Sequence, residues 1–141
     1  MTRKYRVKNF KFCSITTLPL ATRQRIYNHM SYKGGGMHRL IHRNTKRVRV
    51  CLVYHRRRLV AWVALELDRT TVGWKEYNRP SVIAWTDRKY RSRGCASAGI
   101  RELLKRHRSQ LKPNTTITVY HPKIEAVVKD CGYRPRLVEW P

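Results

Sequence analysis

The 141-residue chain carries 32 Lys and Arg against 8 Asp and Glu, which gives a formal net charge of +24. This length fits one domain, residues 1–141, and the 41% hydrophobic content is enough to build one core. The sequence contains no apolar run of membrane-spanning length, and its N-terminus, MTRKYRVKNF, lacks the apolar stretch of a secretory signal. We therefore expect a cytoplasmic protein with no membrane partner.

The positive charge is concentrated in the first half of the chain. The first acidic residue is Glu66, so the 16 Lys and Arg that precede it are unopposed. Charge this one-sided favours a polyanionic partner: nucleic acid, an acidic protein surface or a charged cofactor. Binding would be sequence-tolerant and salt-dependent. The basic clusters are Arg39, Arg43, Lys46, Arg47 and Arg49, and the segment 55–58.

The four cysteines are widely scattered, at Cys13, Cys51, Cys95 and Cys131. None forms a CxxC pair or has a His at the spacing of a zinc ligand, so we expect no metal site. Without a secretory signal, buried reduced thiols are the simplest interpretation of the four cysteines.

The expected elements of the first half are an alternating strand, a helical region and a hairpin. Three consecutive glycines at 34–36 predict a flexible loop that ends the first helix. In chain order we expect a strand over 5–12, a helix from about 20 to 32, a short helix or basic connection over 37–44, and two strands over 48–54 and 59–67 around a turn at 55–58.

The second half predicts a buried strand, a basic turn and an amphipathic helix, followed by a shorter strand–helix–strand unit. Gly132 is expected to cap the last helix at its C-terminus. In chain order we expect a loop or ragged strand end over 69–80, a central strand over 82–85, a helix over 97–111, a strand over 116–120, a helix over 122–131 and a final strand over 133–140.

The turn between the central strand and its helix is a candidate anion site. Gly94 and the small residues that follow it allow a close turn, and a helix N-terminus presents unpaired backbone N–H groups. The pattern is neither GxxxxGK[ST] nor GxGxxG. Four basic side chains surround the turn, at Arg88, Lys89, Arg91 and Arg93.

The pattern Arg91-x-x-Gly94-x-Ala96 resembles the acetyl-CoA loop, Q/R-x-x-G-x-G/A, of the GNAT superfamily of N-acetyltransferases. The expected order of elements, β-α-β-β-β-α-β-α-β, is similar to that of this fold, and Gly132-Tyr133 matches the end of its last helix. The resemblance covers the chain from about Val48 onward. It implies an α/β (α+β) fold with a mixed, mostly antiparallel central sheet flanked by helices. Small size and basicity also resemble compact acetyltransferase-like proteins of bacteriophages.

The resemblance implies a cofactor, acetyl-CoA. Backbone amides of Arg93 to Ala96, with the Arg91 and Arg93 side chains, would hold the pyrophosphate, and Thr86 with its neighbours would align the pantetheine. An acceptor amine would then attack the thioester directly. The implied cofactor-binding residues are Trp85, Thr86, Asp87, Arg88, Arg91, Ser92, Arg93, Gly94, Cys95, Ala96 and Ser97.

The sequence departs from the family at the groups that move protons. Val128 stands where many relatives have a tyrosine that protonates the leaving thiolate, and His121 stands where an asparagine is frequent. His121, Tyr120, Asp87 and Glu66 are the candidate catalytic groups. Each also has a structural interpretation: packing at a strand end for the first two, and an ion pair or solvated charge for the two carboxylates.

Three functions remain open from the sequence. The first is an active acetyltransferase whose acceptor amine is carried by an acidic or nucleic-acid-associated partner. The second is a catalytically weak or inactive protein of the same fold that binds a host protein or nucleic acid through its basic surface. The third is a basic nucleic-acid-binding domain in which the resemblance of the loop is coincidental.

Overall fold

The computed structural model describes residues 9–24, 48–67, 70–72, 75–77 and 80–138. The expected glycine loop at 34–36, the element expected over 37–44 and the basic residues 39–47 lie outside the described residues. So do the first part of the strand expected over 5–12, the helix expected beyond residue 24, and the end of the final strand.

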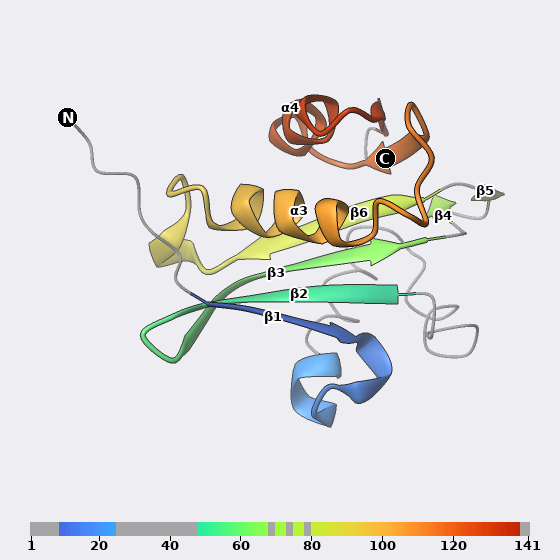
Figure 1. Cartoon of the computed structure of the whole chain (residues 1–141). Helices are drawn as coiled ribbons and strands as arrows, with labels where there is room; N and C mark the ends of the chain where they lie inside the picture. Colours follow the sequence, from blue (N-terminus) through green and yellow to red (C-terminus); the bar gives the residue numbers. More distant parts are fainter. Residues whose placement is uncertain (1–8, 25–47, 68–69, 73–74, 78–79, 139–141) are drawn as a thin grey trace.

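The main structure is a six-stranded mixed sheet with the strand order β1-β2-β3-β6-β7-β8 (Figure 1). The first four strands of this order pair antiparallel, and the last two pairings, β6 with β7 and β7 with β8, are parallel. This confirms the expected α+β class with a mixed sheet. The strands are β1 (Asn9–Ser14), β2 (Val48–His55), β3 (Arg58–Glu66), β6 (Ser81–Thr86), β7 (Thr116–Val119) and β8 (Arg134–Leu137).

Helices α3 (Cys95–Arg106) and α4 (Pro122–Asp130) lie on one side of the sheet (Figure 1). The residues of α3 that recur at helical spacing, Ile100, Leu103 and Leu104, are buried against the sheet in the larger core cluster. Gly99 also faces the sheet, where its hydrogen takes the place of a side chain between Val53 and Val63. The helix therefore approaches β2 and β3 closely.

A second core cluster covers the opposite face of the sheet. Its strand residues include Trp62 of β3 and Ile83 of β6. Ile15 of the short 3-10 helix η1 (Ile15–Thr17) and Leu18 pack onto them, and a helix begins at Leu20. Both faces of the central strands are thus buried, which explains why nearly all residues of β3 are apolar.

The hairpin of β2 and β3 is confirmed, and its turn has an unusual sequence. Arg56 and Arg57 occupy the two turn positions with φ of 48° and 66°. Positive φ at both positions is typical of a type I′ turn, which normally selects Asn-Gly because other side chains disfavour this conformation. Here two arginines adopt it.

The structure corrects several expected boundaries. The helix expected over 97–111 is α3, which begins earlier, at Cys95, and ends at Arg106; Leu111 reaches the core from a turn instead. The segment 69–80, expected to be a loop or a ragged strand end, contains a two-stranded sheet, β4 (Thr70–Val72) with β5 (Lys75–Tyr77). Gly132 follows α4 with φ of 94°, and Tyr133 N–H donates to the Val128 carbonyl, which confirms the C-terminal cap.

All four cysteines are free, as expected, but only two are buried. Cys51 and Cys95 are buried, while Cys13 and Cys131 are half-buried, which corrects that part of the prediction. Burial raises the pKa of Cys51 to about 12, so its thiol stays protonated and unreactive.

Within the described ranges, no helix is long and apolar enough to cross a membrane.

Candidate functional site

The two central strands of the sheet separate part of the way along β6. β6 pairs with β7 at Ser81 and Val82, which lie opposite Thr118 and Val119. β6 continues beside β3 to Thr86, whereas β7 ends at Val119 and the chain turns into α4. The second half of β6 is therefore paired on one side, with a gap on the other where β7 would continue.

The backbone groups of Ala84 and Thr86 face this gap. The amide of Asp87 donates to the Val60 carbonyl over 2.8 Å, so the backbone groups of Asp87 point toward β3. Backbone groups alternate sides along a strand, which directs the N–H and C=O of Thr86 and Ala84 away from β3. An extended ligand could hydrogen-bond to this edge as an added strand would.

The loop from Arg91 to α3 forms a concave run of backbone N–H groups. Ser92 and Gly94 both have positive φ, 64° and 77°, and are separated by Arg93. Alternating conformations of this kind direct successive N–H groups toward one point and create an anion-binding concavity. Gly94 is also the N-cap of α3, and it has no side chain to occupy the first-turn amides. The positive end of the helix dipole therefore opens onto the same point.

A pocket of about 440 Å³ joins the strand edge to the start of α3. Ala84 and Ile100 belong to the face covered by α3, whereas Trp85 and Tyr120 pack against the core cluster on the opposite face. The pocket therefore extends through the sheet at the gap between β6 and β7. Its lining comprises Ile83, Ala84, Trp85, Thr86, Tyr90, Arg91, Ser92, Gly94, Cys95, Ala96, Ser97, Ile100, Tyr120, His121, Lys123 and Ile124.

Most of the residues expected to bind the cofactor lie together in this pocket. Trp85 and Thr86 come from the strand, and Arg91, Ser92 and the segment 94–97 come from the loop and the first turn of α3. Two of the four candidate catalytic groups, Tyr120 and His121, line the wall opposite the loop. The remaining candidates are not part of the lining and are described below.

Tyr120 follows β7 directly and is half-buried beside the gap. Burial raises its pKa well above the ordinary value of 10, and the carboxylate of Glu66 contributes further. The hydroxyl therefore remains protonated over the whole range in which the protein would work, so it can act as a hydrogen-bond or proton donor.

His121 is the N-cap of α4. Its Nδ1 accepts a hydrogen bond from the Lys123 amide over 3.1 Å, and Pro122 occupies the first helical position. A ring nitrogen that accepts is unprotonated, so the neutral ring carries its proton on Nε2. In this form His121 can donate a hydrogen bond from Nε2 and cannot accept a proton at Nδ1 without losing its hydrogen bond to Lys123.

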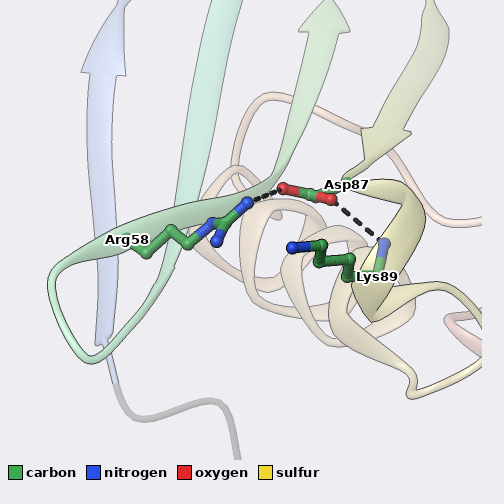
Figure 2. A network of polar contacts seen from close by, with 3 residues as sticks. All are labelled: Arg58, Asp87 and Lys89. Atoms are coloured by element: carbon green, nitrogen blue, oxygen red, sulfur yellow. Dashed lines mark hydrogen bonds and ion pairs between the residues drawn. The ribbon is translucent and has the colours of Figure 1, made fainter.

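Asp87 joins the loop to the β2–β3 hairpin instead of lining the pocket. Figure 2 shows one carboxylate oxygen, Oδ2, bound to the Arg58 guanidinium at 2.9 Å and the other, Oδ1, to the Lys89 amide at 3.0 Å. The Lys89 amide lowers the pKa of Asp87, and Arg58 adds to that effect. A carboxylate held in this way is a weak base. It caps the short 3-10 helix η3 (Arg88–Tyr90).

Arg93 and Arg88 also lie outside the lining. The guanidinium of Arg93 lies over the Tyr90 ring, 5.5 Å from its centroid, and the Arg58 guanidinium lies 5.8 Å from the same ring. Arg88 is exposed at the start of η3. Arg91 is the loop arginine that lines the pocket.

Glu66 ends β3 opposite Ser81 and is half-buried. It is close enough to Tyr120 to influence its pKa, although it is not part of the pocket wall. Cys95 is buried at the start of α3, and burial raises the pKa of its thiol, which argues against a nucleophile.

Sequence reasoning missed six residues of the pocket wall: Ile83, Ala84, Tyr90, Ile100, Lys123 and Ile124. Lys123 and Ile124 belong to the first turn of α4, which the topology brings opposite the start of α3. Val128, which aligns with the family tyrosine, is fully buried in the larger core cluster. The α4 residues that line the pocket are Lys123 and Ile124, and Ile124 lies one helical turn before Val128.

Within the part of the chain that the structure describes, no three His, Cys, Asp or Glu side chains come together as a metal site would require. A comparison with protein-family models finds no match, and a comparison with curated proteins finds no relative.

Proposed function

We propose that the protein is an acetyl-CoA-dependent N-acetyltransferase of the GNAT type. The observation that carries the proposal is the divergence of β6 and β7 after Val82, which opens a pocket through the sheet beside an uncapped helix N-terminus. One end of this pocket suits a phosphate-bearing anion, and the strand edge suits an extended amide-containing chain. Coenzyme A combines these two chemistries in one molecule.

The residues fit the cofactor in two parts. The N–H groups of the concave run, together with Arg91, would bind the pyrophosphate through charge-assisted hydrogen bonds. The free edge at Ala84 and Thr86 would pair with the amides of the pantetheine. Because residues from both faces of the sheet line the pocket, an acceptor amine could approach from the face opposite α3.

In the proposed reaction, the acceptor nitrogen would bond to the thioester carbonyl carbon and the C–S bond would break. The thiolate of coenzyme A would take up a proton from a donor in the pocket, and the proton that the nitrogen loses would restore that donor. Positioning of the two substrates supplies most of the acceleration. We assign the proton to the Tyr120 hydroxyl, because it lines the pocket and stays protonated, whereas the buried Val128 has none to donate. The acceptor is proposed to be an amine on an acidic or nucleic-acid-associated partner, given the net charge of +24.

A second function, binding without turnover, is favoured by one observation. Asp87 is engaged with Arg58 and Lys89, and His121 accepts the amide of Lys123, so neither is poised as a base toward the pocket. In that case the protein would retain coenzyme A or a partner and would not release thiol.

Titration calorimetry with acetyl-CoA and with coenzyme A tests the first function. Because the protein is strongly basic, we would measure binding at low and at high salt, with ATP as a control polyanion. The informative variant is Ser97→Glu. A glutamate at the third position of α3 suits the helix dipole, so the helix is retained while a carboxylate occupies the anion site.

We expect saturable binding that persists in high salt, is stronger than that of ATP, and is weakened by about tenfold to a hundredfold in Ser97→Glu and in Arg91→Ala. Arg101→Ala is the matched control, since this exposed arginine of α3 pairs with Asp130 outside the pocket. Binding that disappears in salt, or that Arg101→Ala reduces as strongly as Arg91→Ala, would contradict the proposal.

A further inference from the structure

The tip of the β2–β3 hairpin and the loop around η3 form one basic surface. The Arg58–Asp87 ion pair joins the two segments, and the rings of His55 and Tyr90 lie with centroids 6.0 Å apart. Apart from Arg91, which lines the pocket, their exposed cations are Arg56, Arg57, Arg58, Arg88, Lys89 and Arg93, which we name the arginine cluster. In sequence, segments 55–58 and 87–94 contain one acidic residue, Asp87, and that carboxylate is bound to Arg58 and Lys89.

The hairpin tip keeps its arginines at an energetic cost. Arg56 and Arg57 both have positive φ, which costs an L-residue other than glycine roughly 1–2 kcal/mol. Asn-Gly would form the same turn with less strain. Both side chains are exposed, so core packing does not account for them. Strained residues of this kind point to a functional requirement, here for two guanidiniums at the tip.

Tyr90 holds two further guanidiniums of the cluster in place. Arg58 and Arg93 lie over its ring at 5.8 Å and 5.5 Å, which reduces the rotamer freedom they would lose when they bind a ligand. The ring is therefore engaged by the protein's own side chains and not presented to a nucleobase. This arrangement favours contact with phosphates, not stacking on bases.

We propose that the arginine cluster binds the phosphodiester backbone of nucleic acid, without base-sequence preference. Five of its six cations are arginines, and the planar guanidinium matches the geometry of phosphate oxygens better than the ammonium group of lysine. A membrane surface fits less well, because peripheral membrane sites combine basic and apolar side chains. Among the described residues, Leu20 is the one exposed large hydrophobic side chain, and it follows the end of β1 remote from the hairpin tip.

This inference does not depend on the proposed acetyltransferase activity. The cluster lies outside the pocket lining, so nucleic-acid binding and binding of coenzyme A can succeed or fail separately. Together they would place an acceptor carried on nucleic acid next to the proposed cofactor site.

The test uses the double variant Arg56→Asn, Arg57→Gly. It removes two charges and installs the preferred type I′ sequence, so the hairpin should be at least as stable as before. Fluorescence anisotropy with labelled duplex DNA, single-stranded DNA and RNA of mixed sequence is measured over a range of salt. We expect affinity near 0.1 M salt to fall by on the order of tenfold or more, and the salt slope on duplex DNA to decrease by about two.

A second variant, Arg88→Gln with Lys89→Gln, tests the loop half of the cluster and should produce a similar loss. The matched control, Lys105→Gln with Lys129→Gln, removes two exposed charges from α3 and α4 and should have a smaller effect. Thermal unfolding verifies that the hairpin variant is folded, and this check holds whether or not the protein binds acetyl-CoA.

The proposal is overturned if the hairpin and loop variants bind as the wild type does, or if the control loses as much affinity as they do. It is also overturned if polyglutamate or anionic phospholipid vesicles bind the cluster as tightly as nucleic acid of equal charge. A difference between the duplex and single-stranded probes identifies the form of nucleic acid, and an equal response of different base sequences supports phosphate recognition.

Discussion

A Cβ atom on Gly99 of α3 would lie 3.0 Å from a methyl carbon of Val53 on β2. A second methyl carbon, of Val63 on β3, would be at 3.1 Å. This contact sets the height of α3 above the sheet, and α3 in turn carries the first-turn amides that open onto the pocket.

We predict that Gly99→Ala destabilises the protein even though alanine is the better helix former. Overpacking of a core typically costs about 1–3 kcal/mol, and replacing a helical glycine by alanine returns about 1 kcal/mol, so a net loss of roughly 1 kcal/mol is expected. Chemical denaturation measures it. Ala98→Gly, at the preceding half-buried position, is the comparison without overpacking, because it lowers the helix propensity and removes one methyl group. A Gly99→Ala protein more stable than the wild type would show that the helix can move away freely.

The hydroxyl of Tyr120 is predicted to serve turnover and not cofactor binding. In Tyr120→Phe we expect thiol release from acetyl-CoA, with a glutamate-flanked lysine peptide as acceptor, to decrease by about 10²- to 10⁴-fold while acetyl-CoA affinity stays within a few fold. Tyr54→Phe, on β2 outside the pocket lining, is the control. Equal turnover of Tyr120→Phe and wild type would remove Tyr120 as the proton donor.

The interaction of Tyr120 with Glu66 can be tested separately, through the pKa of Tyr120. The Glu66 carboxylate contributes to the raised pKa of Tyr120. Removing that negative charge in Glu66→Gln should lower the pKa of Tyr120, which ultraviolet difference spectra report directly. An unchanged titration would mean that burial alone determines it.

His121 is predicted to stabilise α4 through its N-cap hydrogen bond to Lys123. Asparagine keeps a short polar acceptor at this position and alanine does not. His121→Ala should therefore cost about 0.5–2 kcal/mol of the free energy of unfolding, and His121→Asn much less. Thermal unfolding compares the two. If both variants lose the same amount, the ring stabilises the protein through other contacts and not as a cap.

The hydrogen bond from the Lys89 amide to Asp87, with the Arg58 ion pair, predicts how stability depends on pH. The pKa of Asp87 is lower in the folded protein than its ordinary value of 3.8, so folding is favoured while the group is ionised. This contribution is fully present above pH 3.8 and is lost as the pH falls through the lowered pKa. In Asp87→Asn the acid-induced loss of stability over that range should be smaller than in the wild type. Identical acid unfolding profiles would mean that neither the Lys89 amide nor Arg58 stabilises the Asp87 carboxylate appreciably in solution.

Features that depend on the local pattern of residues were predicted correctly from the sequence. The apolar runs of β2, β3 and β6, the glycine before α3 and the cap at Gly132 all depend on neighbours in the chain, and the structure contains them. The short strands β4 and β5 were missed because three residues are too few to show alternation. The end of α3 was missed because neither glycine nor proline marks it, and buried Leu111 extends the apolar pattern past the helix.

The sequence could not predict which basic residues of the loop would face the pocket. Asp87 meets Arg58, 29 residues earlier, because the hairpin folds back beside β6. Arg93 then turns toward Tyr90, while Arg91 remains at the pocket. These side-chain contacts depend on strand pairing between distant segments. The residue pattern within the loop gives no indication of that pairing.

β6 pairs with β3 along its whole length but with β7 only at its start. Proline substitutions in the two parts of the strand should therefore have different effects. Up to Val82 both edges are paired, so a proline there would remove a ladder hydrogen bond or disturb the neighbouring strands. At Ala84 and Thr86 the backbone N–H points away from β3, and a proline would delete a donor on the pocket side only. Backbone substitutions along six residues can thus separate folding from ligand recognition, a separation that side-chain mutagenesis of a core strand rarely allows.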